Sequence, residues 1–319
     1  MKKKVLSKCT ESEMLIQEVY EDFQMENKVK NLSEMTLLFY EQNLKYFKEY
    51  LERAGIEYLG DIEKKHVDKF ILKLKDKGLK DNTINTYLRA TRSFLYFAMR
   101  ENYLSEFKIR LINSDKQQIE PYSKEEIQKL IKKPNLKECG FVEHRNWVLV
   151  NYLLETGNRL NTILNLKVND IDMDNGMVVL TTTKNRQAQF NPISIGLVKI
   201  LVRYIRFYEL NGEDYLFVNE LGKKMTRNSM QHAIARYNRK RGVNKTSIHA
   251  FRHTFAKHYV TSGGDAFKLQ RLLGHSTLQV TLNYVKLYAN DLKEGFERHS
   301  IVSSFEEGQR LQRGKRTKR

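Results

Sequence analysis

The chain contains little proline, glycine or cysteine: its 319 residues include 3 Pro, 16 Gly and 2 Cys. So little proline and glycine excludes collagen and low-complexity linker sequence. Cys9 and Cys139 lie far apart without metal-type spacing, which excludes a disulfide scaffold and favours a reducing compartment. No apolar run approaches the ~18 residues of a membrane helix, and the basic residues at the start precede no apolar stretch of a secretion signal. We therefore expect a cytoplasmic protein that has no membrane partner.

Positive charge is abundant instead. Lys and Arg number 56 against 38 Asp and Glu, which gives a formal net charge of +18, and the sequence pI is about 9.6. This balance favours a polyanionic partner, and the alternative is a basic protein that has none. Hydrophobic residues make up 40% of the chain and charged residues 29%, which is typical of globular proteins, and the length favours two domains.

The N-terminal third shows apolar residues at helical spacing in three successive stretches, which predicts an all-helical domain over residues 31–104. The third stretch carries Asn85, Arg89 and Arg92 on a second face. That face is either a solvated surface or a DNA-facing rim, because Arg and Asn reach phosphates and base edges. Residues 1–30 are expected to be an extension outside this domain, too short for a separate folded domain, and residues 105–121 a linker.

A second domain is expected over residues 122–303, followed by a basic tail over residues 304–319. Ser123 and Glu126 form a capping box that opens it. Residues 177–183 and 190–195 are β-like and bounded by turn signals, which predicts a small antiparallel sheet among helices. The predicted fold class is mainly α (α+β): an all-helical N-terminal domain and a mostly helical second domain with a small antiparallel sheet.

Residues that carry chemistry gather in this second domain. His249 and Arg252 are spaced i, i+3 and share a helix face, and Arg159 opens an amphipathic helix after a glycine turn. His275 and Tyr284 are nine residues apart, about half a turn out of phase, so we expect them on separate elements. Each residue alone has an ordinary structural explanation. His249 and His253 are spaced i, i+4 as in zinc sites, but no thiolate or carboxylate completes a ligand set, so no metal is expected.

Taken in order, these elements resemble the tyrosine recombinases of the phage-integrase and Xer type. The residues that carry the resemblance are Arg159, Lys184, His249-x-x-Arg252, Leu-Gly-His275 and Tyr284. The resemblance covers nearly the whole chain. It implies that residues 31–104 are the core-binding domain, whose DNA-facing helix would carry Thr83, Asn85, Arg89 and Arg92, and that the remainder is the catalytic domain.

The chemistry expected of such a site follows from the anionic phosphodiester. No acidic metal cluster is seen, so Arg159 and Arg252 would balance the charge on the pentacoordinate phosphorus. Tyr284 would be the nucleophile that forms a 3′-phosphotyrosine. Because the bond energy is kept in that link, neither ATP nor another cofactor is expected. Lys184 would be the general acid, His249 would move the proton of Tyr284, and His275 would donate to a non-bridging oxygen.

Two positions depart from the family pattern. Thr162 replaces a carboxylate three residues after the first Arg, and Lys286 replaces a frequent His after the nucleophile. Neither belongs to the six groups assigned roles above, so activity is still expected.

The resemblance also implies a double-stranded DNA recombination site as substrate and a homotetramer in the synaptic complex, with a monomer or dimer when free. Accessory DNA-bending or directionality factors are compatible with it. The segment after Tyr284 would pack on a neighbouring subunit through Leu287, Leu292 and Phe296, or fold back on its own domain. The tail carries a run of basic residues, namely Arg310, Arg313, Lys315, Arg316, Lys318 and Arg319.

Three roles remain open at this point: integration or excision of a mobile element, and resolution of dimers. The alternatives to a recombinase are a type IB topoisomerase, which shares the chemistry, and a non-catalytic DNA-binding protein on a recombinase scaffold.

Overall fold

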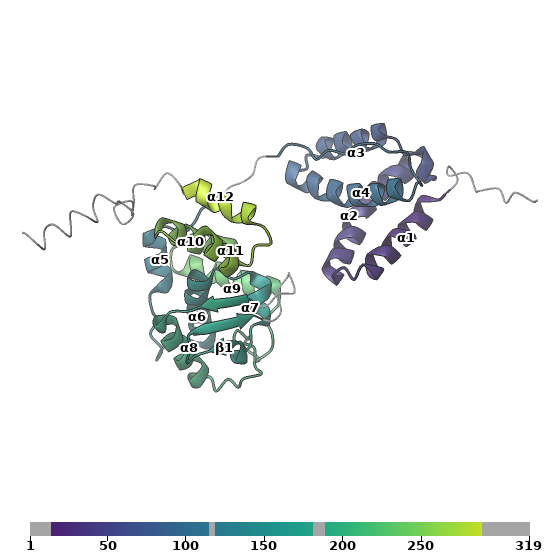
Figure 1. Ribbon diagram of the computed structural model, residues 1–319. Helices are drawn as coiled ribbons and strands as arrows, with labels where there is room; N and C mark the ends of the chain where they lie inside the picture. Colours follow the sequence, from purple (N-terminus) through teal and green to yellow (C-terminus); the bar gives the residue numbers. More distant parts are fainter. Residues whose placement is uncertain (1–13, 115–118, 181–188, 289–319) are drawn as a thin grey trace, which may run out of the picture. The chain divides into compact units, whose positions relative to one another are not determined.

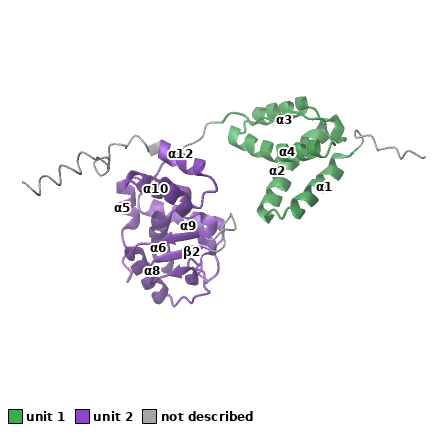
Figure 2. Cartoon of the chain, viewed as in Figure 1, with its two compact units in different colours: residues 1–117 green, residues 118–319 purple. Residues whose placement is uncertain are grey.

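The computed structural model describes residues 14–114, 119–180 and 189–288, with the side chains of 287 and 288 left out. The chain divides into two compact units, residues 1–117 and 118–319 (Figure 2). None of the described helices is long and apolar enough to cross a membrane.

Unit 1 is a helical bundle, as the apolar spacing predicts. Its elements are α1 (Ile16–Val29), α2 (Glu34–Arg53), the 3₁₀ turn η1 (Leu59–Asp61), α3 (Lys64–Asp76) and α4 (Asp81–Arg100). Helix α4 packs against each of the other three helices and carries many of the core side chains (Figure 1). Phe47, Phe70 and Phe94 are 2% exposed or less, so aromatic rings fill the centre of the bundle.

The borders of unit 1 differ from those expected from the sequence. Residues 1–30 were expected to lie outside the helical domain, but α1 buries Ile16, Val19 and Phe23 in the unit 1 core. The expected linker over residues 105–121 also begins too early. Ile109 is buried in the same core and Ile112 packs against it. Apolar residues are present in both segments: Ile16, Val19 and Phe23 recur at helical spacing, and residues 107–112 include four apolar side chains. The expected borders rested on the shortness of the first segment and the loss of helical periodicity in the second, and neither property shows whether a segment packs on another element.

Unit 2 is built around one buried helix. Helix α6 (Phe141–Thr156) has an almost unbroken run of buried residues from 144 to 153, the pattern of a helix covered on all sides. The helices around it are α5 (Lys124–Ile131), α7 (Leu160–Asn165), α8 (Ile195–Phe207), α9 (Arg227–Lys240) and α10 (Ile248–Thr261). Helices α11 (Ala266–Leu273) and α12 (Leu278–Tyr288) complete the unit (Figure 1). The capping box of Ser123 and Glu126 is present at the start of α5.

A three-stranded antiparallel sheet lies beside these helices, in the order β1-β2-β3. Strand β2 (Met177–Leu180) pairs with β3 (Gln189–Pro192), with Val178 opposite Asn191, so the predicted hairpin strands are confirmed. The short strand β1 (Ile171–Asp172) after η2 (Val168–Asp170) was not predicted and joins β2 through the predicted turn at 174–176. The mainly helical fold class with a small antiparallel sheet is confirmed.

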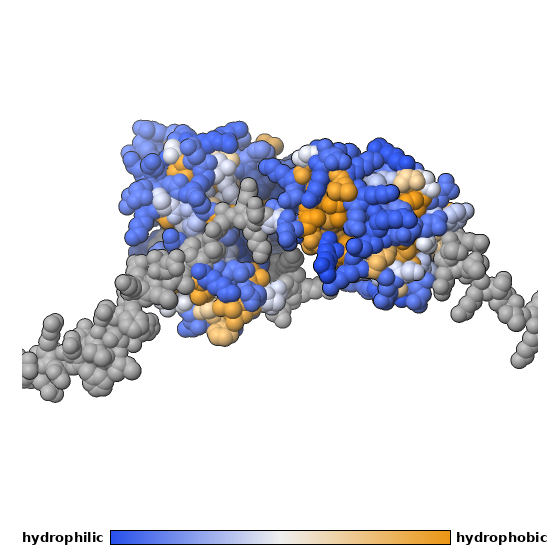
Figure 3. All heavy atoms as spheres, turned by 90° about the horizontal axis from the view of Figure 1, so that it is seen from above, coloured by the Kyte–Doolittle hydropathy of each residue, from blue (hydrophilic) through white to orange (hydrophobic). Residues whose placement is uncertain are grey.

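The apolar side chains separate into a core for each unit and a small third cluster. That cluster joins α10, α11 and α12 through Ala256, Leu269, Leu273 and Tyr284. The surface seen in Figure 3 is mostly hydrophilic, and hydrophobic atoms show only in separate patches. Tyr284 therefore lies in a small cluster of its own rather than in the main core around α6.

Candidate active site

Arg159 is placed by a turn at the end of the buried helix α6. Gly157 ends the helix in the left-handed region at φ 57°, and a Cβ atom there would lie 2.7 Å from the ring of Phe255. Asn158 is buried and donates to the Tyr152 hydroxyl at 2.9 Å, which holds the turn to α6. Arg159 is then the N-cap residue of α7. The backbone of Arg159 is therefore held between the end of α6 and the start of α7, which fixes the position of its Cα.

The guanidinium of Arg159 is available for a ligand. No hydrogen bond or ion pair of this side chain is found within the described part of the chain. Burial lowers the pKa of Arg159, and the nearby Tyr284 side chain partly opposes that shift. A half-buried cation without a protein partner is a group that an anionic ligand would stabilise.

Arg252 bridges the elements of the site. Its side chain is 7% exposed and donates to the carbonyl oxygens of Gly157 at 3.0 Å and Leu273 at 2.8 Å. Burial and then the positive charge of Arg159 lower the pKa of Arg252 to about 10. Two guanidinium groups are thus held close enough to repel each other, an arrangement that an anion between them would relieve.

The end of α11 places His275. Gly274 adopts φ 59°, and the backbone N–H of His275 donates to the Gln270 carbonyl at 3.0 Å, so the chain turns sharply after the helix. The His275 imidazole lies parallel to the Tyr284 ring, with an interplanar angle of 4° and centroids 6.0 Å apart. Tyr284 belongs to α12, so His275 and Tyr284 lie on separate elements as the spacing predicts.

A second imidazole also contacts Tyr284. His253 lies on α10 beside Arg252, and its ring centroid is 5.1 Å from that of Tyr284 at an angle of 54°. Its buried Nδ1 has no hydrogen-bond partner among the residues described. Burial lowers the pKa of His253, and His249 and Arg252 lower it further. The sequence predicts no role for His253 beyond a potential zinc ligand, and the signal for its contact with Tyr284 is its position next to Arg252 and one turn after His249.

His249 differs from His253 in its surroundings. It is exposed, and no ring contact with Tyr284 occurs among the described residues. Burial of part of the ring and the positive charges of Arg252 and Arg227 lower the pKa of His249. The structure thus brings Arg159, Arg252, His275 and Tyr284 together, and it adds His253, while His249 lies at the edge of this group.

Lys184 lies outside the described residues, but the strand that follows it is tied to the site. In β3, the side-chain amides of Gln189 and Asn191 both donate to the Leu272 carbonyl, the latter at 2.8 Å. The two carbonyls at the end of α11, of Leu272 and Leu273, are therefore capped by β3 and by Arg252. Sequence reasoning missed Gln189 and Asn191, because their role depends on a contact about 80 residues further along the chain.

The predicted DNA-facing residues on α4 do not behave alike. Arg89 is exposed, and Thr83 and Arg92 are half-buried. Asn85 is 2% exposed, and its amide donates to the Ile112 carbonyl at 2.9 Å and accepts from the Ile112 N–H at 3.0 Å. The expectation that Asn85 contacts DNA is therefore corrected, since both polar atoms of its amide already bind the chain after α4.

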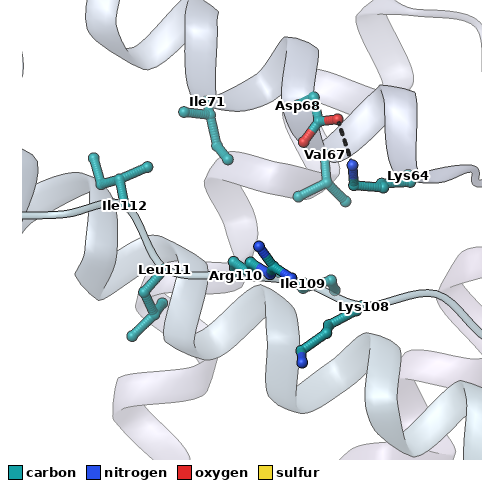
Figure 4. Close-up of a pocket in the computed structure, with 9 residues that line it drawn as sticks. All are labelled: Lys64, Val67, Asp68, Ile71, Lys108, Ile109, Arg110, Leu111 and Ile112. Atoms are coloured by element: carbon teal, nitrogen blue, oxygen red, sulfur yellow. Dashed lines mark ion pairs between the residues drawn. The ribbon is translucent and has the colours of Figure 1, made fainter.

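A cavity of about 510 Å³ lies beside this same segment. It is lined by α3 and residues 108–112, and Figure 4 shows Lys64 and Asp68 forming an ion pair at 3.6 Å at its rim. Lys108 and Arg110 add positive charge, whereas Val67, Ile71 and Leu111 are apolar. The described residues contain no group of three or more His, Cys, Asp or Glu side chains arranged to hold a metal ion. Leu292, Phe296 and the basic tail lie outside the described residues.

The chain matches two family models. Residues 122–291 match the phage integrase family, and residues 23–102 match the phage integrase N-terminal SAM-like domain. The chain belongs to the phage integrase family. It is thus a tyrosine-type site-specific recombinase, as the order of its motifs predicts. The start of the second match at residue 23 includes part of α1, in agreement with the packing of that helix in unit 1.

Individual relatives agree with this assignment. The chain is 26% identical over 292 residues to tyrosine recombinase XerD of Staphylococcus haemolyticus, covering 88% of this chain and 97% of the relative. It is 28% identical over 275 residues to XerD of Staphylococcus epidermidis, covering 83% and 92%. Among solved structures, the Tn1549 transposon integrase in complex with a circular intermediate DNA has a TM-score of 0.68 at 20% identity, covering 83% of this chain and 94% of that one. The XerH recombinase bound to its palindromic difH substrate has a TM-score of 0.66 at 21% identity, covering 88% and 84%.

Proposed function

We propose that this recombinase cuts and rejoins double-stranded DNA at a specific site through a covalent 3′-phosphotyrosine formed by Tyr284. The observation that carries the proposal is the convergence of Tyr284, Arg252 and His275 with the guanidinium of Arg159 around the end of α11. A nucleophile beside two cations is the arrangement that phosphoryl transfer requires, because negative charge grows on the phosphorus oxygens in the transition state.

The two arginines have different parts in this reaction. Arg159 has an unused planar fork that matches two phosphate oxygens. Arg252 already donates to two carbonyls and also supplies positive charge to the same space. Because guanidinium groups supply the charge, we expect equal cleavage with Mg²⁺ and in EDTA. No nucleotide is consumed, since the phosphotyrosine keeps the energy of the broken bond.

Proton transfer completes the proposed mechanism. His275 would donate a hydrogen bond to a non-bridging oxygen, and Lys184 would protonate the leaving 5′-oxygen. His249 remains the proposed route for the proton of Tyr284, and the contact of His253 with the Tyr284 ring makes it a positioning residue for the nucleophile. Lowered pKa values keep these imidazoles neutral near pH 7, so each ring offers one N–H that can donate a hydrogen bond and one nitrogen that can accept one.

DNA is the substrate that fits the rest of the chain. The net charge of +18 favours a polyanion, and the exposed Arg89 with the half-buried Thr83 and Arg92 offers contacts to DNA from α4. Several structural relatives are recombinases bound to DNA, among them the Tn1549 integrase and XerH. Exchange of two duplexes requires four cuts, so a homotetramer on two sites is proposed, with a monomer or dimer when free.

The decisive experiment is trapping on a nicked DNA substrate that releases the cut end. Wild-type protein should form a covalent complex at the 3′ end of the cut strand, because the released fragment cannot religate. The Tyr284→Phe variant should form none and bind the same DNA with unchanged affinity. Tyr259→Phe on α10 is the matched control, since this tyrosine lies outside the arginine pair, and it should still be trapped.

Other outcomes separate the alternatives. Covalent trapping of Tyr284→Phe would overturn the assignment of the nucleophile. Relaxation of supercoiled DNA without any recombinant product would identify a topoisomerase. A wild-type chain that binds DNA but is never trapped would be a non-catalytic DNA-binding protein.

A further inference from the structure

Thr281 lies on α12 one turn before Tyr284 and is fully buried. Its hydroxyl oxygen is 2.8 Å from Nδ1 of His275, a hydrogen-bond distance. The same helix therefore holds the nucleophile and contacts the imidazole that lies parallel to it. Either atom could donate in this bond, so the direction of the bond has to be decided from the surroundings.

His275 is uncharged in these surroundings. Burial lowers the pKa of His275 to about 3, and the charges of Arg252 and Arg159 act in the same direction. The imidazole is therefore neutral at physiological pH and carries one N–H, either on Nδ1 or on Nε2. Only the form with the hydrogen on Nε2 leaves a donor on the side of the ring away from Thr281.

The hydroxyl hydrogen of Thr281 needs an acceptor. Other buried threonines of unit 2 donate to the carbonyl one turn earlier, as Thr156 does to Tyr152 and Thr254 does to Ala250. Thr281 shows no such bond within the described ranges, and His275 is the partner found for its hydroxyl there. If Nδ1 donated to Thr281, the hydroxyl hydrogen would be buried without an acceptor, an unfavourable arrangement. Donation from Thr281 to Nδ1 satisfies both groups.

We propose that Thr281 is a positioning residue that donates to Nδ1 of His275, and so holds the hydrogen on Nε2 for donation to a phosphate oxygen. The inference rests on the proposed function for the role of His275, but the direction of the bond can be measured without DNA. It also couples the two groups: α12 cannot move Tyr284 out of the site without releasing the hydrogen bond that orients His275.

Two variants of Thr281 separate the hydroxyl from the shape of the side chain. Thr281→Val keeps the shape and removes the donor, and we expect cleavage of the nicked substrate to fall by about 10- to 100-fold, by analogy with the loss of a partner that orients a metal-bound histidine. Thr281→Ser restores the hydroxyl and should recover most of the rate. Thr261→Val on α10 is the matched control, because its hydroxyl donates to the His258 carbonyl near the helix end and not to a site histidine.

The tautomer of His275 distinguishes a positioning role of Thr281 from a purely structural one, because loss of packing alone would not change the tautomer. Long-range ¹H–¹⁵N spectra of the full chain labelled with ¹⁵N-histidine, assigned with His275→Gln, should show hydrogen on Nε2 in the wild type. Thr281→Val should shift this signal toward a mixture of tautomers, and Thr281→Ser should not. Added to His275→Gln, Thr281→Val should cause no further loss of rate, because the threonine acts through the histidine.

Hydrogen on Nδ1 in the wild type would overturn the proposal. So would an unchanged tautomer and rate in Thr281→Val, or a full additional loss in the double variant. Because the tautomer is measured on DNA-free protein, it stands apart from the trapping test: failure to trap Tyr284 would remove the proposed function and leave the hydrogen bond assignment in place.

Discussion

At the residue scale, the site concentrates groups that burial keeps uncharged next to groups that stay charged. His275 and His253 flank the ring of Tyr284, and Arg252 lies beside them. A proton on either imidazole would add positive charge next to the arginine pair, so both rings resist protonation. The folded state therefore binds fewer protons than the unfolded chain when the solution becomes acidic.

This predicts that unit 2 loses stability below about pH 6.5. His275 has a folded pKa of about 3. Against an unfolded value near 6.5, its contribution to the free energy of unfolding is complete above pH 6.5 and falls by about 2 kcal/mol by pH 5. Urea unfolding at pH 7.5, 6 and 5 measures this, and the fluorescence of the single tryptophan, Trp147 on α6, reports on unit 2. His275→Gln should show a smaller loss between pH 7.5 and 5, and an equal loss would show that other groups take up the protons.

At the element scale, the end of α11 connects the elements that carry the site residues. The carbonyl of Leu272 accepts from β3, that of Leu273 accepts from Arg252, and Gly274 then turns the chain toward His275. Helix α12 docks next to it on a small apolar cluster. Strand β3, Arg252 on α10 and helix α12 all contact this one helix end, so a small displacement of the helix end would move each of them.

Gly274→Ala should therefore impair cleavage more than stability. A Cβ at Gly274 would lie 2.5 Å from the Gln189 side chain and 3.2 Å from the Arg159 guanidinium. Gly242→Ala is the matched control, since Gly242 has φ 71° and nothing within 4 Å. Both variants should lose about 1 kcal/mol from backbone strain, by urea unfolding. Only Gly274→Ala should lose cleavage as well, and equal activity of the two variants would show that the helix end does not position Arg159.

At the scale of the whole molecule, the linker between the two units begins after residue 112, whereas the sequence predicts that it begins at residue 105. Asn85 holds Ile112 through both atoms of its amide, and the Tyr96 hydroxyl accepts from the Ile109 N–H at 3.1 Å. These hydrogen bonds from α4 side chains to the backbone of Ile109 and Ile112 hold residues 109–112 against α4. The linker leaves unit 1 from a defined place as a result.

Asn85→Ala should release this segment without unfolding unit 1. We expect the amide of Ile112 to exchange its hydrogen about tenfold faster or more, because it loses its acceptor. Hydrogen–deuterium exchange with peptides covering residues 105–114 measures the change. Asn82→Ala, at an exposed position on the same helix, should leave the exchange unaltered, and unchanged protection in Asn85→Ala would mean that the segment is held by its apolar contacts alone.

Much of the architecture could be predicted from local pattern. The helical stripes of unit 1, the hairpin strands and the capping box at Ser123 follow from spacing and turn chemistry, which act between residues near in sequence. Helix α1 was missed as part of unit 1 although Ile16, Val19 and Phe23 recur at helical spacing, because a local stripe predicts a helix but does not show which domain that helix packs against. The prediction for Asn85 was wrong for a related reason. Helical spacing shows which face of the helix an asparagine lies on, but it does not show whether its amide contacts solvent, DNA or another segment of the same chain.

By itself, the sequence determined the family, the order of the chemical groups and their assignment to separate elements, because motif spacing and helical periodicity are local properties. Only the tertiary structure decided that His253 shares the contact with Tyr284, that Thr281 bonds His275, and that Gln189 and Asn191 tie β3 to α11. Those contacts depend on how buried polar groups find partners when helices pack, and residues far apart in the chain supply them.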